Sequence, residues 1–84
     1  MKKIELDKEL DLHYFHPADT EDLILEFIKI SKEKRCSTVK IIHGKGKSVK
    51  KHQLYKILEK HPDVESFYND NYNWGATIVN LILD

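Results

Sequence analysis

Apolar residues in this chain change their spacing several times between residues 9 and 83, and each change marks a boundary between a strand and a helix. Residues 9–13 alternate polar and apolar side chains, which is the two-residue period of a strand. Three further runs are short and rich in aliphatic or β-branched residues, as strands are: residues 38–43, 64–68 and 76–83. The last of these runs is apolar enough to lie inside a sheet. The chain therefore predicts four strands.

Two longer segments carry apolar residues at intervals of three and four, which is the spacing of a buried helix face. We expect the first helix to have Asp19 as its N-cap and to end near Lys34. Its buried face is predicted to hold Leu23, Ile24, Phe27, Ile28 and Ile30. We expect the second helix to run from about Val49 to Lys60, before Pro62, which cannot continue a helix. Its inward residues are predicted to be Leu54, Ile57 and Leu58.

The resulting order, β-α-β-α-β-β, predicts an α/β (α+β) domain built as a two-layer sandwich, with a four-stranded mixed sheet and two helices on one face. The two strand–helix–strand crossovers favour parallel pairs, whereas the last two strands, joined by a loop, can pair antiparallel. The order of the strands in the sheet stays open. The 84 residues leave room for one core, so we assign residues 9–84 to the domain and residues 1–8 to a charged lead-in. Cys36 is the only cysteine, so the fold must hold without an internal disulfide.

Membrane and secreted classes are excluded by the hydropathy pattern. No apolar run approaches the roughly 18–20 residues that span a bilayer. The charged start of the chain does not have the apolar core of a secretory signal. We therefore expect a cytoplasmic protein with no membrane partner. Because the pattern shows no unexplained apolar face, we also expect a monomer.

Acidic and basic residues balance at 14 each, but they are unevenly distributed. The first third of the chain is rich in acids, whereas the segment Lys40–Leu58 contains none. That segment holds lysines and histidines: Lys40, His43, Lys45, Lys47, Lys50, Lys51, His52 and Lys56. A basic patch beside glycines is typical of a phosphate-binding surface. Lysines on a solvated helix face would produce the same composition.

Asp11 and His13 form the first candidate site. Two residues apart at the end of a predicted strand, they point the same way, so that the carboxylate can orient or stabilise the imidazole. Open α/β sheets build their sites at such strand ends. The spacing alone favours a plainer interpretation, in which both are ordinary surface residues near a sheet edge.

His43 and the loop residues 44–48 form the second candidate site. The loop follows a predicted buried strand and opens a helix. Its two glycines allow close backbone approach, and free amides at a helix N-terminus bind anions. The spacing matches neither a Walker loop nor a dinucleotide fingerprint. A tight turn with incidental lysines is the alternative, but the context favours phosphate binding. If the first two strands are parallel, His13 and His43 would lie on neighbouring loops as a plausible acid–base pair.

The aromatic segment 71–75 is the third candidate site. An exposed Tyr72 or Trp74 could stack on a nucleic-acid base. In a hairpin such rings can instead cover the sheet edge or the core, and we prefer that interpretation for both residues. No metal site is predicted, because His16 lies in a loop and the chain has no cysteine pair.

Three short motifs together resemble the Smr (small MutS-related) domain family: Leu10–His13, Ile41–Gly46 and Trp74–Thr77. They occur in the order and spacing of that family, and the similarity extends from about Glu9 to Leu83. The first motif followed by Phe15-His16-Pro17, together with a Trp before Gly-Ala-Thr, looks like one branch of small stand-alone Smr proteins.

The resemblance implies nucleic-acid binding and a DNA-nicking or RNA-cleaving activity, which family members use in DNA repair or recombination or on messenger RNA at stalled ribosomes. It places the family's acidic residue and histidines on Asp11, His13 and His43, for which we predict catalytic roles. Together with the basic loop, it predicts nucleic-acid contacts by Gly44, Lys45, Gly46, Lys47, Ser48, Lys50, Lys51, Trp74, Gly75 and Thr77.

The chain also departs from the family pattern. Tyr14 stands where many members have a glycine after the first histidine. Ser48, Lys50 and Lys51 stand where the second motif usually continues with another glycine and then Leu-Arg. Lysine keeps the charge of arginine but lacks its bidentate fork, so weaker binding than in a typical member is expected.

The first hypothesis is an endonuclease. Asp11 orients His13, His13 and His43 transfer protons, and the loop amides with Lys45 hold the scissile phosphate. RNA would supply its own 2′-OH as the nucleophile, whereas cleavage of DNA would need water and would favour Mg²⁺ or Mn²⁺ near Asp11.

The second hypothesis is a non-catalytic module that docks on RNA, DNA, a ribonucleoprotein or a repair partner. A binder of small phosphates or nucleotides is a third option.

Overall fold

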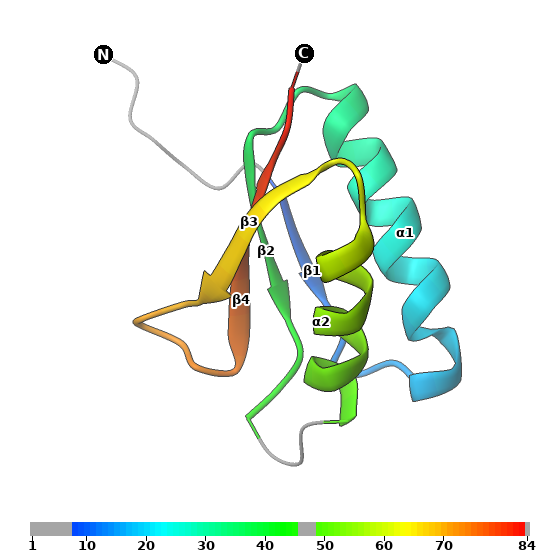
Figure 1. Ribbon diagram of the computed structural model, residues 1–84. Coiled ribbons are helices and arrows are strands. Elements are labelled where there is room, and N and C mark those ends of the chain that lie inside the picture. Colours follow the sequence, from blue (N-terminus) through cyan, green and yellow to red (C-terminus); the bar gives the residue numbers. More distant parts are fainter. Residues whose placement is uncertain (1–7, 46–48, 84) are drawn as a thin grey trace.

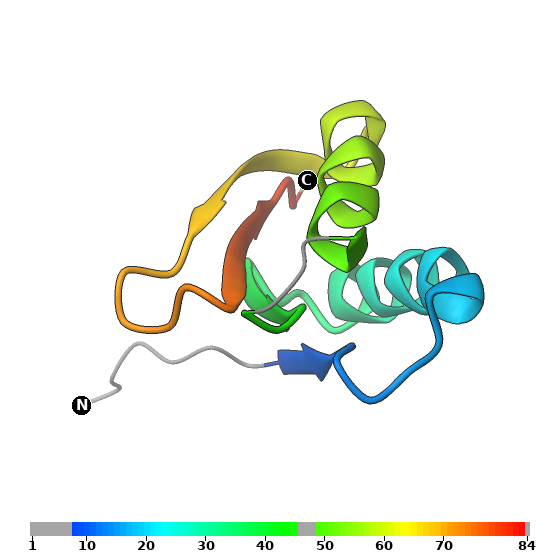
Figure 2. The same cartoon turned by 90° about the horizontal axis from the view of Figure 1, so that it is seen from below.

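The computed structural model describes residues 8–45 and 49–83. These form six elements: β1 (Lys8–Asp11), α1 (Pro17–Glu33), β2 (Thr38–Ile42), α2 (Val49–Lys60), β3 (Val64–Asn69) and β4 (Ala76–Leu81). The predicted class, element order and two-layer arrangement are confirmed. Both helices cover the same face of one mixed sheet (Figures 1 and 2). The predicted lead-in, residues 1–8, lies outside the described residues except for Lys8, which begins β1.

The strands lie in the order β1-β2-β4-β3. The first crossover makes a parallel pair as expected, since β1 pairs parallel with β2. The second crossover does not, because β4 lies between β2 and β3 and pairs antiparallel with both. The physical reason is burial: five of the six residues of β4 are buried, whereas none of β3 is. The most apolar strand therefore occupies the inside of the sheet, and β3 takes the edge.

The first helix begins earlier than its acidic residues indicate. His16, not Asp19, is the N-cap: the amide of Ala18 donates to His16 Nδ1 at 3.0 Å, and Pro17 occupies the first turn. Proline is preorganised for that position and needs no hydrogen-bond partner for its nitrogen. Asp19 lies within the first turn, where the helix dipole still favours its charge.

The buried face of α1 is also rotated from the predicted one. Its fully buried side chains are Thr20, Ile24, Ile28 and Ser31. Leu23 and Phe27 are only partly buried against the core. In α2 the bounds match the prediction, with Leu54 and Leu58 buried and Ile57 partly buried. The small hydroxyl residues at both ends of the α1 stripe are consistent with close packing of the helix on the sheet.

One core lies between the helices and the sheet. Its buried members are Leu12, Ile24, Ile28, Cys36, Val39, Ile41, Leu54, Leu58, Val79 and Leu81. Fully burying one large aliphatic side chain is worth roughly 1.5–3 kcal/mol. The core anchors β1, β2 and β4 side by side, and their register places Asp11 beside Ile42 and Ile42 beside Ala76. The loops that follow β1 and β2 and the loop that precedes β4 therefore meet at one edge of the sheet.

Candidate active site at one edge of the sheet

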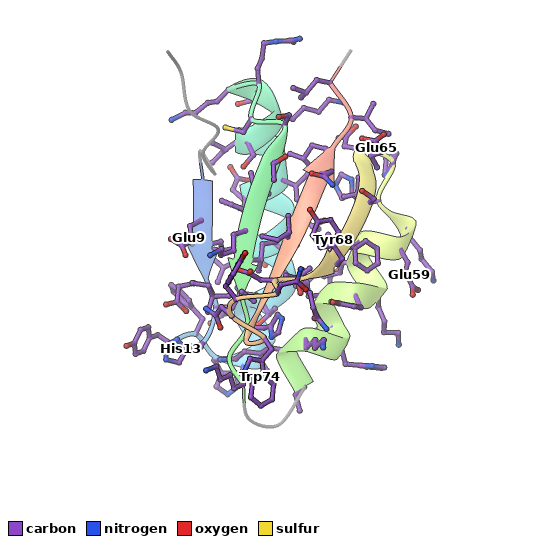
Figure 3. All side chains as sticks on the ribbon, turned by 90° about the vertical axis from the view of Figure 1, so that its left-hand side faces the viewer. Glu9, His13, Glu59, Glu65, Tyr68 and Trp74 are labelled. Atoms are coloured by element: carbon purple, nitrogen blue, oxygen red, sulfur yellow. The ribbon has the colours of Figure 1, made fainter. Side chains whose placement is uncertain are left out.

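Three chain segments converge at this edge, which lies at the bottom of Figure 1. They are residues 12–16 after β1, residues 43–45 after β2 and residues 70–75 before β4. Figure 3 shows His13 and Trp74 at this end of the sheet, while Tyr68 lies farther up the strands. The structure therefore brings the three sequence motifs together, although they lie some 30 residues apart along the chain.

Asp11 and His13 are in direct contact. His13 Nδ1 lies 2.8 Å from Asp11 Oδ1, and the His13 backbone amide donates to the same oxygen at 3.0 Å. Both side chains are accessible, at 46% for His13 and 41% for Asp11. Because the carboxylate accepts the Nδ1 proton, Nε2 is the ring nitrogen left for a ligand. It has no hydrogen-bond partner among the residues that the structure describes.

The carboxyl group of Asp11 is held in its charged form. Desolvation on its own raises the pKa of Asp11, but the hydrogen bonds from the His13 side chain and amide outweigh it. The charges of His13 and Lys50 act in the same direction, and the pKa ends below its ordinary value of 3.8. Asp11 is therefore ionised at neutral pH and can fix the orientation of the imidazole.

Lys50 braces the turn that carries this pair. Its ammonium group donates to the carbonyl oxygens of Leu12 at 2.9 Å and His13 at 3.1 Å. This links the start of α2 to the loop after β1. Lys50 was predicted to contact nucleic acid, but the structure engages its donors with the backbone of the protein. The sequence carried no signal for this role, because the partners are 37 and 38 residues away.

His43 occupies a different environment from His13. It is 5% exposed, its Nδ1 lies 3.0 Å from the Gly44 carbonyl oxygen and its Nε2 lies 3.0 Å from Thr77 Oγ1. Burial lowers the pKa of His43 below its ordinary value of 6.5, and the nearby Lys51 charge lowers it further, although the bond to Gly44 opposes them. A carbonyl oxygen can only accept, so Nδ1 of the ring donates to Gly44, while Nε2 contacts the Thr77 hydroxyl.

The hydrogen-bonded chain extends beyond Thr77. The Thr77 hydroxyl lies 3.3 Å from the hydroxyl of Tyr55, which donates to Asn69 Oδ1 at 3.0 Å. We call His43, Thr77, Tyr55 and Asn69 the histidine network. It joins β2, β4, α2 and β3. Sequence reasoning missed the partly buried Tyr55, although its place beside the inward-facing Leu54 was a usable signal, since a tyrosine hydroxyl that partly leaves water needs a partner.

Two glycines bring the second and third motifs into contact. The Gly75 carbonyl oxygen accepts from the amides of His43 at 2.8 Å and Gly44 at 2.9 Å. The Gly44 amide is thus bound to protein rather than open to a phosphate. A methyl group on Gly75 would lie 2.9 Å from Lys45 Cγ and 3.1 Å from the Gly44 carbonyl carbon. Gly44 has φ 95°, a conformation that favours glycine, and its Cβ position lies 3.4 Å from His13 Cβ.

The aromatic side chains of this edge are exposed. Tyr72 is 97% exposed and Trp74 68%, so the expectation that they cover the sheet edge or the core is wrong. The physical reason is that Ala76 begins the buried part of the strand, and the preceding turn carries both rings outward. Tyr14 is 81% exposed and its ring centroid lies 4.0 Å from that of His13.

The lysines of the second motif lie against aromatic rings. Lys45 Nζ is 5.5 Å from the Trp74 ring centroid, and Lys51 Nζ is 5.5 Å from that of Tyr55. Lys45 is exposed and brings positive charge to the edge that also carries His13 and Trp74. The predicted contacts by Gly46, Lys47 and Ser48 lie outside the described residues.

Within residues 8–45 and 49–83, no group of three or more His, Cys, Asp or Glu side chains is arranged to hold a metal ion. In the same ranges no helix is both long and apolar enough to cross a membrane.

This fold, with its three motifs gathered at one sheet edge, defines an Smr domain. The family model for the Smr domain matches residues 10–82, and the chain belongs to that family. Among its curated relatives, ribosome rescue factor SmrB of Yersinia enterocolitica is 32% identical over 77 residues, which cover 92% of this chain and 44% of the relative. SmrB of Photorhabdus laumondii is 31% identical over 88% of this chain and 42% of the relative. The chain spans less than half the length of these relatives.

Solved structures agree with the fold. The Smr domain of Thermus thermophilus MutS2 superposes with a TM-score of 0.85 at 26% identity, covering 89% of this chain and 98% of that one. YdaL, a stand-alone small MutS-related protein from Escherichia coli, superposes with a TM-score of 0.83 at 22% identity. That match covers 87% of this chain and 63% of YdaL.

Proposed function

We propose that this Smr domain is an endonuclease that cleaves RNA. The observation that carries the proposal is the Asp11–His13 pair, in which a charged carboxylate fixes one ring nitrogen of an exposed histidine. This is the arrangement of a general base whose second nitrogen faces its substrate. The relatives named ribosome rescue factors support RNA rather than DNA as the substrate, with the ribosome as its setting and the cytoplasm as its location.

The reaction uses the 2′-OH of the RNA as its nucleophile. His13 Nε2 takes the proton of the 2′-OH while the 2′-oxygen forms a bond to phosphorus. The bond from phosphorus to the 5′-oxygen breaks, and that oxygen takes a proton from water or from the protonated His13. The products are a 2′,3′-cyclic phosphate and a 5′-OH. Asp11 stabilises the imidazolium that forms during this step, and Lys45 compensates charge on the phosphate.

His43 has a positioning role in this proposal instead of a proton-transfer role. It is buried and both ring nitrogens contact protein groups. Its amide and that of Gly44 hold the Gly75 carbonyl, so the ring and backbone of His43 together set the distance between the second and third motifs. The loop that touches His13 through Gly44 is thereby held in place.

The burial of His43 also favours the second candidate function, a binding module without catalysis. With His43 engaged by protein, His13 is the histidine of the two whose ring is free to act on a substrate. A site with one such group can bind a phosphodiester backbone without cleaving it. This candidate uses the same exposed edge and the same partner, a strand of RNA.

The deciding experiment incubates the protein with end-labelled single-stranded and hairpin RNA, with DNA of the same sequence and with supercoiled plasmid, each with and without EDTA. Cleavage of RNA alone, in EDTA, with a cyclic phosphate product, is expected for the wild type. His13→Ala should abolish it, and His52→Ala, which changes an exposed histidine of α2, should not. EDTA-sensitive plasmid nicking would overturn the RNA assignment. Binding without cleavage of any substrate would overturn the endonuclease and support the non-catalytic binding module.

A further inference from the structure

We propose that Tyr14 and Trp74 are base-stacking residues on two sides of the Asp11–His13 pair, so that the substrate is RNA with unpaired nucleotides next to the scissile phosphate. This inference rests on the proposed function, but it assigns a role to Tyr14, which no motif contained. It also adds a specificity for single strands that catalysis by His13 does not require.

Tyr14 and Trp74 both present their rings to solvent. A large aromatic ring normally gains free energy by leaving water, yet Tyr14 is 81% exposed and Trp74 is 68% exposed. Within the described residues, neither ring packs against the hydrophobic core. Both lie in short connections whose backbone is tied down. Lys50 holds the carbonyl of His13, the neighbour of Tyr14, and the Asn73 side chain accepts from the Gly75 amide at 3.0 Å.

Tyr14 and Trp74 lie in loops at the same end of the sheet. The register that aligns Asp11, Ile42 and Ala76 sets the ends of β1 and β4 two strand spacings apart, roughly 10 Å. Tyr14 follows the first of these strands and Trp74 precedes the other. A chain of contacts links the two loops through His13 and Gly44. The Cβ of His13 lies beside Gly44, and the Gly44 amide donates to the carbonyl of Gly75, the neighbour of Trp74. Figure 3 shows His13 and Trp74 at the same end of the sheet.

The positive charge beside Trp74 favours nucleic acid over an apolar protein partner. Lys45 Nζ lies over one face of Trp74 at 5.5 Å, which places a cation beside the ring and leaves its other face for a base. Between Lys40 and Leu58 the sequence has no acidic residue. Aromatic rings beside lysines are the pattern that binds single strands, because every base has a face to stack and every linkage has a charge. A duplex keeps its bases stacked on each other and cannot offer them.

The test uses an RNA octamer with 2′-O-methyl groups, which blocks the nucleophile, and a duplex of the same sequence. Trp74 is the only tryptophan in the chain, so intrinsic fluorescence reports on this ring alone. The single strand should quench it and the duplex should not. Tyr14→Ala should weaken binding of the single strand by roughly 5- to 150-fold, the range for loss of one stacked base, and Tyr14→Phe should restore it. Tyr68→Ala removes an exposed tyrosine of β3 away from this edge and should change nothing.

Each contrary result is distinct. Equal binding by wild type and Tyr14→Ala, or equal quenching by duplex and single strand, would overturn the stacking role while leaving cleavage by His13 intact. A loss in Tyr68→Ala as large as in Tyr14→Ala would also overturn it, because the effect would not be local to this edge. Conversely, quenching and the Tyr14 effect without cleavage of unmodified RNA would support stacking and overturn the endonuclease.

Discussion

The two motif histidines of this domain lie in opposite environments. His13 is exposed, hydrogen-bonded to a charged carboxylate and open at one ring nitrogen. His43 is buried, neutral and bonded at both nitrogens to Gly44 and Thr77. In the proposed function the same side chain therefore supplies chemistry in one loop and fixed geometry in the next. A histidine in a motif is therefore not by itself evidence of proton transfer, and its surroundings decide which role it has.

The difference follows from how each residue is packed. His13 follows the edge strand β1, in a turn that faces solvent. His43 follows β2, which has neighbours on both sides, and the Thr77 hydroxyl from β4 reaches its ring. A polar ring can be buried there because both of its nitrogens have hydrogen-bond partners.

The largest expected effect is on the exposed pair. Asp11→Asn should lower the rate of RNA cleavage by roughly 10²- to 10⁴-fold, because an amide no longer holds the charged form of the imidazole that develops during proton transfer. The midpoint of thermal unfolding should change little, since the pair is exposed. Asp63→Asn makes the same substitution in a carboxylate bonded to Lys32 and should keep full activity. A normal rate in Asp11→Asn would break the contrast between the two histidines.

The next largest effect is expected at Gly75, which connects the third motif to Gly44 between the two histidines. Gly75→Ala should lower the free energy of unfolding by about 1–3 kcal/mol, because its methyl group meets backbone atoms of Gly44 and Lys45. Gly44→Ala should cost about 1 kcal/mol, from its positive φ rather than from crowding. Denaturation in urea measures both. Loss of cleavage in Gly75→Ala with unchanged substrate affinity would support a positioning role for the contact between Gly75 and Gly44. An unchanged free energy of unfolding would contradict that role.

The buried histidine should show its own pH dependence. Its folded pKa is lowered by burial, so below the ordinary value of 6.5 the unfolded chain takes up a proton that the folded chain resists. The stability that the neutral His43 ring contributes is fully present above pH 6.5, and it is lost as the pH falls from there toward the folded pKa. His43→Gln cannot titrate, and the slope of the unfolding free energy against pH in this window should be shallower. Identical slopes for the two proteins, measured by urea denaturation at several pH values, would contradict the assignment.

The smallest effects should separate two lysines of the basic segment. Lys45→Ala should reduce the slope of log affinity against log salt for single-stranded RNA by about 0.7, one phosphate contact, with stability unchanged. Lys50→Ala should leave that slope unchanged and lower the free energy of unfolding by about 1 kcal/mol, since its donors serve the carbonyls of Leu12 and His13. Fluorescence titrations at several salt concentrations measure the slope. A smaller slope for Lys50→Ala would show that Lys50 contacts a phosphate after all.

Much of the fold was available from the sequence because it depends on local spacing. The bounds of α2 and the presence of all four strands follow from hydrophobic period. The two-residue separation of Asp11 and His13 marked them as a candidate pair, but their contact forms because β1 ends at Asp11 and the chain turns at His13. The motif resemblance correctly indicated the family. The error at the start of α1 is also local: His16 competes with Asp19 as a cap, and Pro17 decides between them.

Only the tertiary structure decided the contacts between residues that lie far apart in the sequence. The place of β4 between β2 and β3, the bond from Lys50 to the His13 carbonyl and the bond from His43 to Thr77 join segments separated by 34 residues or more or by a crossover. Whether Trp74 is exposed and His43 buried depends on these contacts. By itself the sequence determined which elements form and which residues are candidates for chemistry, because both follow from short-range spacing and residue type. The burial of each site residue was decided by packing across the sheet, where many distant side chains compete for one limited core.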